Sequence, residues 1–202
     1  MVQTTAGNLI ELIMNKEHNS VLVIGCMHGD EPQGEYLIKK YLELKKNTKL
    51  MFIPSVNPDG VALKTRVNSN GVDINRNFPT KNWEFTKKDN FWGGSKPASE
   101  IETQFVIETV EKFKPSLILT LHAPYKVVNY DGDAKEIAEK ISAIIDYPVE
   151  ASIGYPTPGS FGTWAGIEKK IPTITLELDE EIDIRELEEP IFEIFKMLEK
   201  YN

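Results

Sequence analysis

The apolar stretch Val21–Cys26 (VLVIGC) leads through one methionine into the polar turn His28–Glu31 (HGDE). The stretch does not alternate apolar and polar side chains, which is typical of a strand buried on both faces of a sheet. Pro32 follows the turn, and proline favours the first position of a helix. Apolar residues then recur at roughly helical spacing between Tyr36 and Leu44. The sequence therefore predicts a strand, a polar turn and a helix in this order.

The same alternation of strands and helices continues along the chain. The further predicted strands are Leu50–Val56, Leu117–Leu121 and Thr173–Leu178. The predicted helices are Ser99–Lys114, Asp133–Ile145, Ser160–Lys170 and Ile184–Tyr201, the first opened by Ser99 and Glu102 in a capping-box pattern. Strands that alternate with helices indicate an α/β fold, with a mostly parallel sheet and helices on both faces. We find no repeat and no clear linker, so residues 1–202 are expected to form a single domain.

Composition and charge limit the possible functions. The chain has 202 residues, 41% of them hydrophobic, and a net charge of −8, which argues against nucleic acid as a partner because phosphate binding needs a basic face. No apolar run reaches the roughly 18 residues that a membrane span needs, and the first residues do not resemble a secretory signal. Cys26 is the single cysteine. Together these features lead us to expect a cytoplasmic protein.

Two of the three histidines follow predicted buried strands. His28 and Glu31 lie three residues apart in one turn, and His122 ends the apolar run Leu117–Leu121. In parallel sheets the carboxyl ends of the strands meet at one edge, where ligands bind. Two imidazoles and one carboxylate form a three-ligand set for zinc that leaves a fourth position open for water. The alternative is that each histidine is an isolated structural hydrogen-bonding group, since the HxxE spacing alone also occurs by chance.

Glu177 lies within the predicted strand Thr173–Leu178. A carboxylate among strand-forming residues is costly to bury unless it is paired or used. Near a bound zinc ion it could take a proton from a water molecule and pass it to a leaving amine. Strict alternation would equally place Glu177 on an outward-facing side of the strand, and this alternative stays open here.

The segment 57–97 is rich in Asn, Gly, Pro and Asp, and a loop of this length in a compact domain is usually functional. Two of the three arginines of the chain, Arg66 and Arg76, lie in it, although most of the 23 basic residues are lysine. Arginine grips a carboxylate with two hydrogen bonds, and Asn75 is a further donor. Asp73 could accept a histidine N–H and orient a zinc ligand. Surface charge is the alternative role for both arginines.

Five segments of the chain resemble the zinc carboxypeptidases of the funnelin type, in the order found in that family. These segments are His28–Glu31, Asn57–Gly60, Gly71–Phe78, Leu119–His122 and Thr175–Glu177. Within the family, Tyr155–Trp164 is most similar to the murein peptide amidases, which cut between γ-D-glutamate and meso-diaminopimelate in cell-wall peptides. The resemblance implies a mixed rather than a purely parallel sheet.

The resemblance also implies a role for each matching residue. His28, Glu31 and His122 would bind one catalytic zinc ion, and Glu177 would be the general base and acid. Arg66 would stabilise the developing oxyanion. Asn75 and Arg76 would hold the free C-terminal carboxylate of a small peptide, and Tyr155 would cover the scissile bond.

Two other functions compete with this interpretation. The first is a zinc deacylase of the aspartoacylase or succinylglutamate desuccinylase type, which shares the zinc ligands but not the segments Asn57–Gly60 and Thr157–Gly162. The second is a non-catalytic module that binds zinc or peptides. Such a module would be expected to have lost the base or the arginines, and this chain has both.

Overall fold

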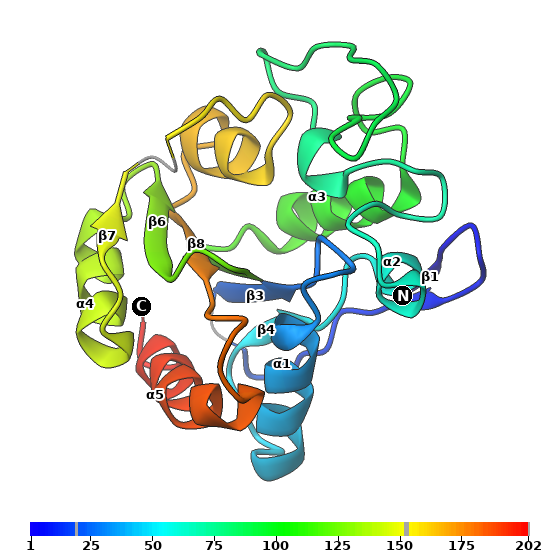
Figure 1. The fold of residues 1–202 in the computed structure, drawn as a ribbon. Coiled ribbons are helices and arrows are strands. Elements are labelled where there is room, and N and C mark those ends of the chain that lie inside the picture. Colours follow the sequence, from blue (N-terminus) through cyan, green and yellow to red (C-terminus); the bar gives the residue numbers. More distant parts are fainter. Residues whose placement is uncertain (19, 152–153, 202) are drawn as a thin grey trace.

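The computed structural model describes residues 1–18, 20–151 and 154–201. Its centre is a six-stranded sheet with the strand order β4-β3-β5-β8-β6-β7 (Figure 1). In chain order, the strands of this sheet are β3 Val21–Gly25, β4 Met51–Ile53, β5 Leu117–His122, β6 Val127–Asp131, β7 Val149–Glu150 and β8 Thr173–Glu177. The predicted strands at Val21–Cys26, Leu117–Leu121 and Thr173–Leu178 are therefore confirmed to within one residue, whereas the strand expected over Leu50–Val56 is shorter.

Two strands of this sheet, β6 and β7, run against the other four. β6 pairs antiparallel with β8, whereas the pairs β3–β4, β3–β5, β5–β8 and β6–β7 are parallel. The mixed, mostly parallel sheet is thus confirmed. β6 itself has no counterpart among the predicted elements, since it follows β5 after only a short connection and alternates apolar and polar residues.

Helices cover both faces of the sheet, as predicted (Figure 1). The helices are α1 Gln33–Leu44, α2 Pro58–Leu63, α3 Ile101–Phe113, α4 Lys135–Ile145 and α5 Glu188–Leu198, with shorter turns η1 Ile74–Arg76, η2 Thr163–Glu168 (π-helical) and η3 Ile184–Leu187. Side chains of α1, α4 and α5 pack in one apolar cluster, and those of α3 and η2 pack in the other. Alternate residues of β3 enter the two clusters, as expected of a strand buried on both faces.

Two predicted helix starts are wrong in detail. The capping box at Ser99 does not form, because the Ser99 hydroxyl donates to the Glu100 carboxylate at 2.6 Å and the helix begins at Ile101. The helix expected from Ser160 is the shorter turn η2. None of the helices in the described ranges is both long and apolar enough to cross a membrane.

A small N-terminal hairpin, β1 Val2–Gln3 with β2 Leu9–Ile10, is joined to α2 through Asp59. The Asp59 side chain is buried. It accepts hydrogen bonds from the Thr4 hydroxyl at 2.6 Å, the Asn8 amide at 2.7 Å and the Ser69 hydroxyl at 2.7 Å. Burial alone would raise the pKa of Asp59, but these donors outweigh it and lower the pKa.

We expect Asp59→Ala to lower the free energy of unfolding by about 2–4 kcal/mol at neutral pH, because several buried donors lose their acceptor. Ser69→Ala, which removes only one of them, is expected to cost about 1 kcal/mol. Because the folded-state pKa is lowered, the stabilisation should fade as the pH falls below about 4. Urea unfolding at several pH values measures both effects, and equal losses in the two variants would contradict the assignment.

Candidate active site

Three adjacent parallel strands deliver polar side chains to one edge of the sheet. His28 follows β3, His122 is the last residue of β5, and Glu177 is the last residue of β8. β5 lies between the other two strands, and His122 is paired in register with Glu177. This edge is the carboxyl end of the strands, where α/β sheets bind ligands. The strand order therefore gathers residues that are up to about 150 positions apart in the chain (residues 28 and 177 of the sequence).

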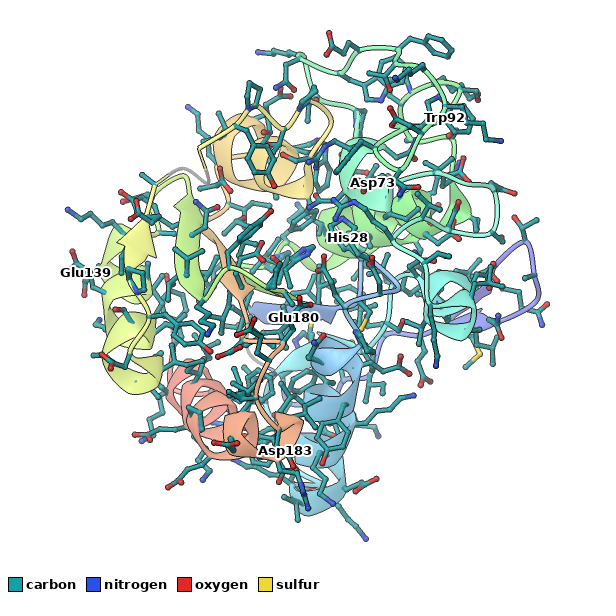
Figure 2. All side chains as sticks on the ribbon, in the orientation of Figure 1. His28, Asp73, Trp92, Glu139, Glu180 and Asp183 are labelled. Carbon is teal, nitrogen blue, oxygen red and sulfur yellow. The ribbon has the colours of Figure 1, made fainter. Side chains whose placement is uncertain are left out.

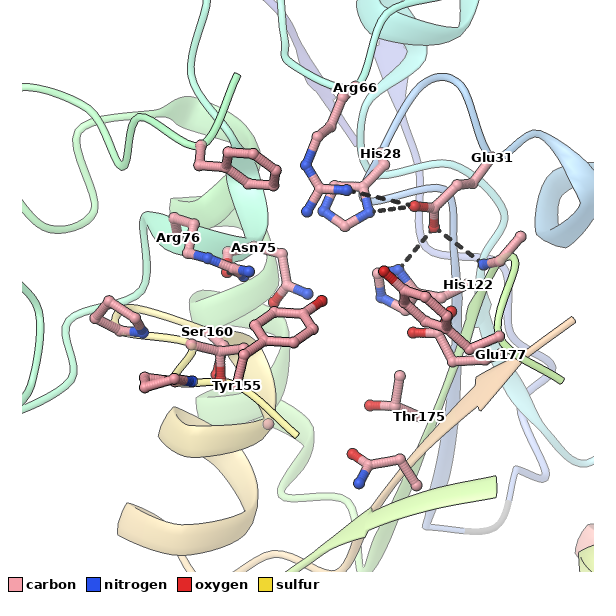
Figure 3. A pocket seen from close by; sticks show the side chains of 18 of the residues that line it. His28, Glu31, Arg66, Asn75, Arg76, His122, Tyr155, Ser160, Thr175 and Glu177 are labelled. Carbon is pink, nitrogen blue, oxygen red and sulfur yellow. Dashed lines mark hydrogen bonds and ion pairs between the residues drawn. The ribbon is translucent and has the colours of Figure 1, made fainter. Parts of the chain in front are cut away.

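The carboxylate of Glu31 lies between the two histidines (Figure 3). Its Oε1 is 2.7 Å from Nδ1 of His28, and its Oε2 is 2.9 Å from Nδ1 of His122. One potential ligand atom of each residue lies within 4.8 Å of the others, and all three side chains are buried. Two imidazole nitrogens and one carboxylate oxygen fit a catalytic zinc ion, which uses three protein ligands and keeps one open position.

The turn that carries His28 and Glu31 depends on a glycine. A Cβ atom on Gly29 would lie 2.0 Å from the carbonyl carbon of Gly60, so no larger residue fits without moving the backbone. The N–H of Gly29 also donates to the carbonyl of Arg66 at 3.3 Å. The turn is thereby packed directly on α2 and on the segment that carries Arg66.

Asp73 contacts the ring nitrogen of His28 that does not face Glu31. The Oδ1 atom of Asp73 lies 3.2 Å from Nε2 of His28, and its Oδ2 atom accepts from Nε of Arg66 at 2.9 Å. Figure 2 shows His28 and Asp73 close together above the sheet. A proton on Nε2 that points to Asp73 leaves Nδ1 free for a metal ion, an arrangement common among metal-binding histidines. The orienting role expected for Asp73 thus has the geometry that it needs.

Charges within this cluster compensate one another. Burial alone would lower the pKa of His28, but the carboxylates of Asp73 and Glu31 outweigh it and raise that pKa to about 9. Burial alone would likewise raise the pKa of Glu31 and of Asp73, but the neighbouring imidazoles, and for Asp73 also Arg66, hold both well below the usual range. A buried cluster of this kind is stable only because each charge has a partner.

Glu177 differs from the other acids in the cluster. It is buried, and its Oε2 atom has no hydrogen-bond partner among the residues that the structure describes. Burial raises the pKa of Glu177 above its ordinary value, although the nearby histidines oppose this. A carboxyl group whose pKa is raised towards neutrality can both accept and return a proton.

Hydrogen-bond donors line the opposite wall of the same cavity (Figure 3). The Oδ1 atom of Asn75 accepts from the N–H of Phe161 at 2.9 Å, so its NH2 group is the end left for a ligand. Arg76 is largely buried, and its Nη1 donates to the carbonyl of Asn75 at 2.7 Å. Tyr155 lies at the rim with 45% of its surface exposed. The Arg66 guanidinium lies between these donors and Glu31, 5.1 Å from the centre of the Phe91 ring.

The eight residues predicted to bind metal or substrate or to catalyse the reaction line one cavity of about 1170 Å³, and Asp73, predicted to orient a zinc ligand, is not part of its lining. The eight residues are His28, Glu31, Arg66, Asn75, Arg76, His122, Tyr155 and Glu177. Three further polar residues on the sheet, Asn129, Asp131 and Thr175, line it as well and were not predicted. The alternation of polar residues along Val127–Asp131 would have revealed the first two, had that strand been recognised.

Comparisons with known proteins agree with this geometry. Residues 3–142 match the zinc carboxypeptidase family. Murein peptide amidase A of Escherichia coli K12 is 33% identical over 162 residues, which are 72% of this chain and 65% of that protein. The corresponding protein of Vibrio campbellii is 33% identical over 171 residues, or 78% of this chain and 68% of that protein. This chain thus matches somewhat less than two thirds of the Escherichia coli relative.

Solved structures of zinc carboxypeptidase-like proteins have the same fold as this chain. The crystal structure of murein-tripeptide amidase MpaA from Escherichia coli O157 superposes with a TM-score of 0.86 at 28% identity, over 99% of this chain and 90% of that one. The carboxypeptidase A of Helicoverpa armigera shares the fold, with a TM-score of 0.75 at 16% identity over 97% of this chain and 65% of that one. With a family match over more than half of its length and a site that fits zinc, the chain belongs to the zinc carboxypeptidase family.

Proposed function

We propose that this protein is a zinc-dependent hydrolase that removes the C-terminal residue from small peptides. The observation that carries the proposal is that one cavity has two kinds of residue on its walls. The group His28, Glu31 and His122, which could hold a metal ion, lies on one side, and Asn75 and Arg76, which can donate hydrogen bonds to a carboxylate, lie on the other. An enzyme that releases a C-terminal residue needs donors that position the free carboxylate and catalytic groups that act on the adjacent bond. Family membership supports the zinc-dependent chemistry.

In the proposed mechanism, His28, Glu31 and His122 would hold a zinc ion. Zinc held there would supply a Lewis acid that polarises the scissile carbonyl and lowers the pKa of a water molecule. Glu177 accepts the proton of the attacking water and then delivers it to the nitrogen of the leaving amine, a task that suits a carboxyl group of raised pKa. The guanidinium of Arg66, held by Asp73, stabilises the negative charge that develops on the carbonyl oxygen.

Arg76 and Asn75 hold the terminal carboxylate, so that only the last residue is released. Arginine suits this task because its planar fork offers paired hydrogen bonds to a carboxylate. Tyr155, at the rim, covers the scissile bond and donates a hydrogen bond to the substrate. We further propose that residues 1–202 act as one zinc carboxypeptidase-like catalytic domain.

For the substrate we propose a murein tripeptide, cut between γ-D-glutamate and meso-diaminopimelate during the recycling of cell-wall peptides in the cytoplasm. The similarity to proteins called murein peptide amidase A supports this choice. The direct test is incubation of the zinc-loaded protein with L-Ala-γ-D-Glu-meso-diaminopimelate, followed by mass spectrometry for free diaminopimelate. Cleavage of N-acyl amino acids instead would favour a deacylase, and binding of the tripeptide without cleavage would favour a binding module.

We expect Glu177→Gln to lower kcat by at least about 1000-fold, because the amide cannot accept a proton from water. Zinc content, measured by atomic absorption, should stay near one per chain. Glu181→Gln removes the same charge from an exposed position nearby and should leave kcat unchanged. Substantial turnover by Glu177→Gln would contradict the role of Glu177 as the base.

We expect Arg76→Ala to raise KM for the tripeptide by about 10- to 100-fold, since a buried, charge-assisted pair is lost. Arg185→Ala is the matched control, because Arg185 is exposed and pairs with Asp183 on the surface. Steady-state kinetics on the tripeptide and on its C-terminal amide test the idea. If the wild-type protein cleaves the amide as well as the acid, Arg76 does not bind the carboxylate.

Removal of zinc with a chelator should abolish activity, and added zinc should restore it. Zinc at about 100 times its dissociation constant should also raise the free energy of unfolding by about 2.7 kcal/mol. His122→Ala should lose both effects, whereas His18→Ala, which changes the histidine outside the triad, should keep them. Thermal unfolding with and without zinc provides a readout that does not depend on activity.

A further inference from the structure

The floor of the cavity is a row of polar side chains on two antiparallel strands. On β8, Thr175 lies two residues before Glu177 and therefore on the same face of the sheet. The register between β6 and β8 places Asn129 beside Thr175 and Asp131 two residues further along β6. Thr175, Asn129 and Asp131 all line the cavity. The row thus leads from the proposed base towards Asp131 over four strand positions, or about 13 Å.

Asp131 ends this row against the backbone of η2. A Cβ atom on Gly162 would lie 2.2 Å from Oδ2 of Asp131, and one on Gly166 would lie 2.3 Å from its Cβ. Only glycine at these two positions lets the turn pack directly on the Asp131 side chain. A carboxylate rather than an apolar side chain therefore lines this end of the row.

The Asp131 carboxylate has no counter-charge within the described part of the chain. Among the described residues, no ion pair or side-chain hydrogen bond to its carboxylate is formed, and burial raises its pKa. The two arginines of the cavity are engaged elsewhere, Arg66 with Asp73 and Arg76 beside Asn75. Lys126, at the opposite end of β6 from Asp131, pairs with Asp179. A partly buried carboxylate without a partner is costly, and a cation supplied by a ligand would remove that cost.

We infer that Asp131 binds the ammonium group at the end of the side chain of the residue that the enzyme removes. This inference rests on the proposed function, because it needs a C-terminal residue seated between Arg76 and the metal triad. It selects long side chains with a terminal amine, such as those of diaminopimelate and lysine, over apolar side chains of equal length. Asn129, whose amide donates one hydrogen to the carbonyl of Glu150 at 2.9 Å, keeps a second N–H for the distal carboxylate of diaminopimelate.

Three tripeptides test the inference, each built on L-Ala-γ-D-Glu and ending in meso-diaminopimelate, L-lysine or L-norleucine. Norleucine is a close match to lysine in which the amine is absent. The wild-type protein should cleave the two amine-bearing peptides with a kcat/KM at least about 30-fold above that for the norleucine peptide. Equal cleavage of the lysine and norleucine peptides would overturn the role of Asp131 and leave the proposed function standing. No cleavage of any of the three would refute the proposed function itself.

The variant Asp131→Asn keeps the shape of the side chain and removes its charge. It should lower kcat/KM for the diaminopimelate and lysine peptides by about 30-fold or more, mostly through KM, and change that for the norleucine peptide by less than about two-fold. Asp133→Asn removes the same charge from an exposed position outside the cavity and should change none of the three. An equal loss on all three peptides in Asp131→Asn would mean that Asp131 only supports the fold, and would overturn the inference.

Discussion

The carboxylate of Glu31 contacts an imidazole from each of two neighbouring strands, and the remaining parts of the site are arranged around this contact. His28 comes from the turn after β3 and His122 from the end of β5. Both can reach the same carboxylate only because the two strands are parallel neighbours that end at one edge. The arrangement places several charges in a largely apolar interior. It is tolerated because Glu31 and Asp73 each face cations, and Glu31 with the two imidazoles would also hold a metal ion.

Much of this fold could be predicted because the central strands are buried on both faces. Val21–Cys26 and Leu117–Leu121 are apolar throughout, which a parallel strand between two layers of helices requires. β6 could not be found in this way, since it joins the sheet near one side, in the opposite direction, and carries Asn129 and Asp131 into the cavity. The predicted capping box at Ser99 was wrong for a local reason. The hydroxyl that should cap the helix is bonded to Glu100 instead.

The residues of the candidate site likewise differ in how far the sequence predicts them. The metal triad, Glu177 and the donors Asn75 and Arg76 were found because they lie beside strand ends or in recognisable segments of the sequence. The only sequence signal for Asp131 is the alternation of polar residues along β6, and its packing against the two glycines Gly162 and Gly166 of a distant turn cannot be predicted from that pattern. Residues proposed to act chemically could thus be predicted from the sequence, whereas the residue proposed to select the substrate depends on how separate elements pack.

Asp73 contacts His28 with one oxygen and Arg66 with the other, so that a proposed zinc ligand and the arginine proposed to stabilise the oxyanion share one counter-ion. Loss of the Arg66 guanidinium would remove the partner of one Asp73 oxygen and strengthen the interaction of Asp73 with the imidazole. The effects of substituting His28 and Arg66 should therefore be non-additive, since each substitution alters the electrostatic surroundings of the other residue. In the proposed mechanism, metal affinity and catalytic rate are therefore energetically coupled through Asp73.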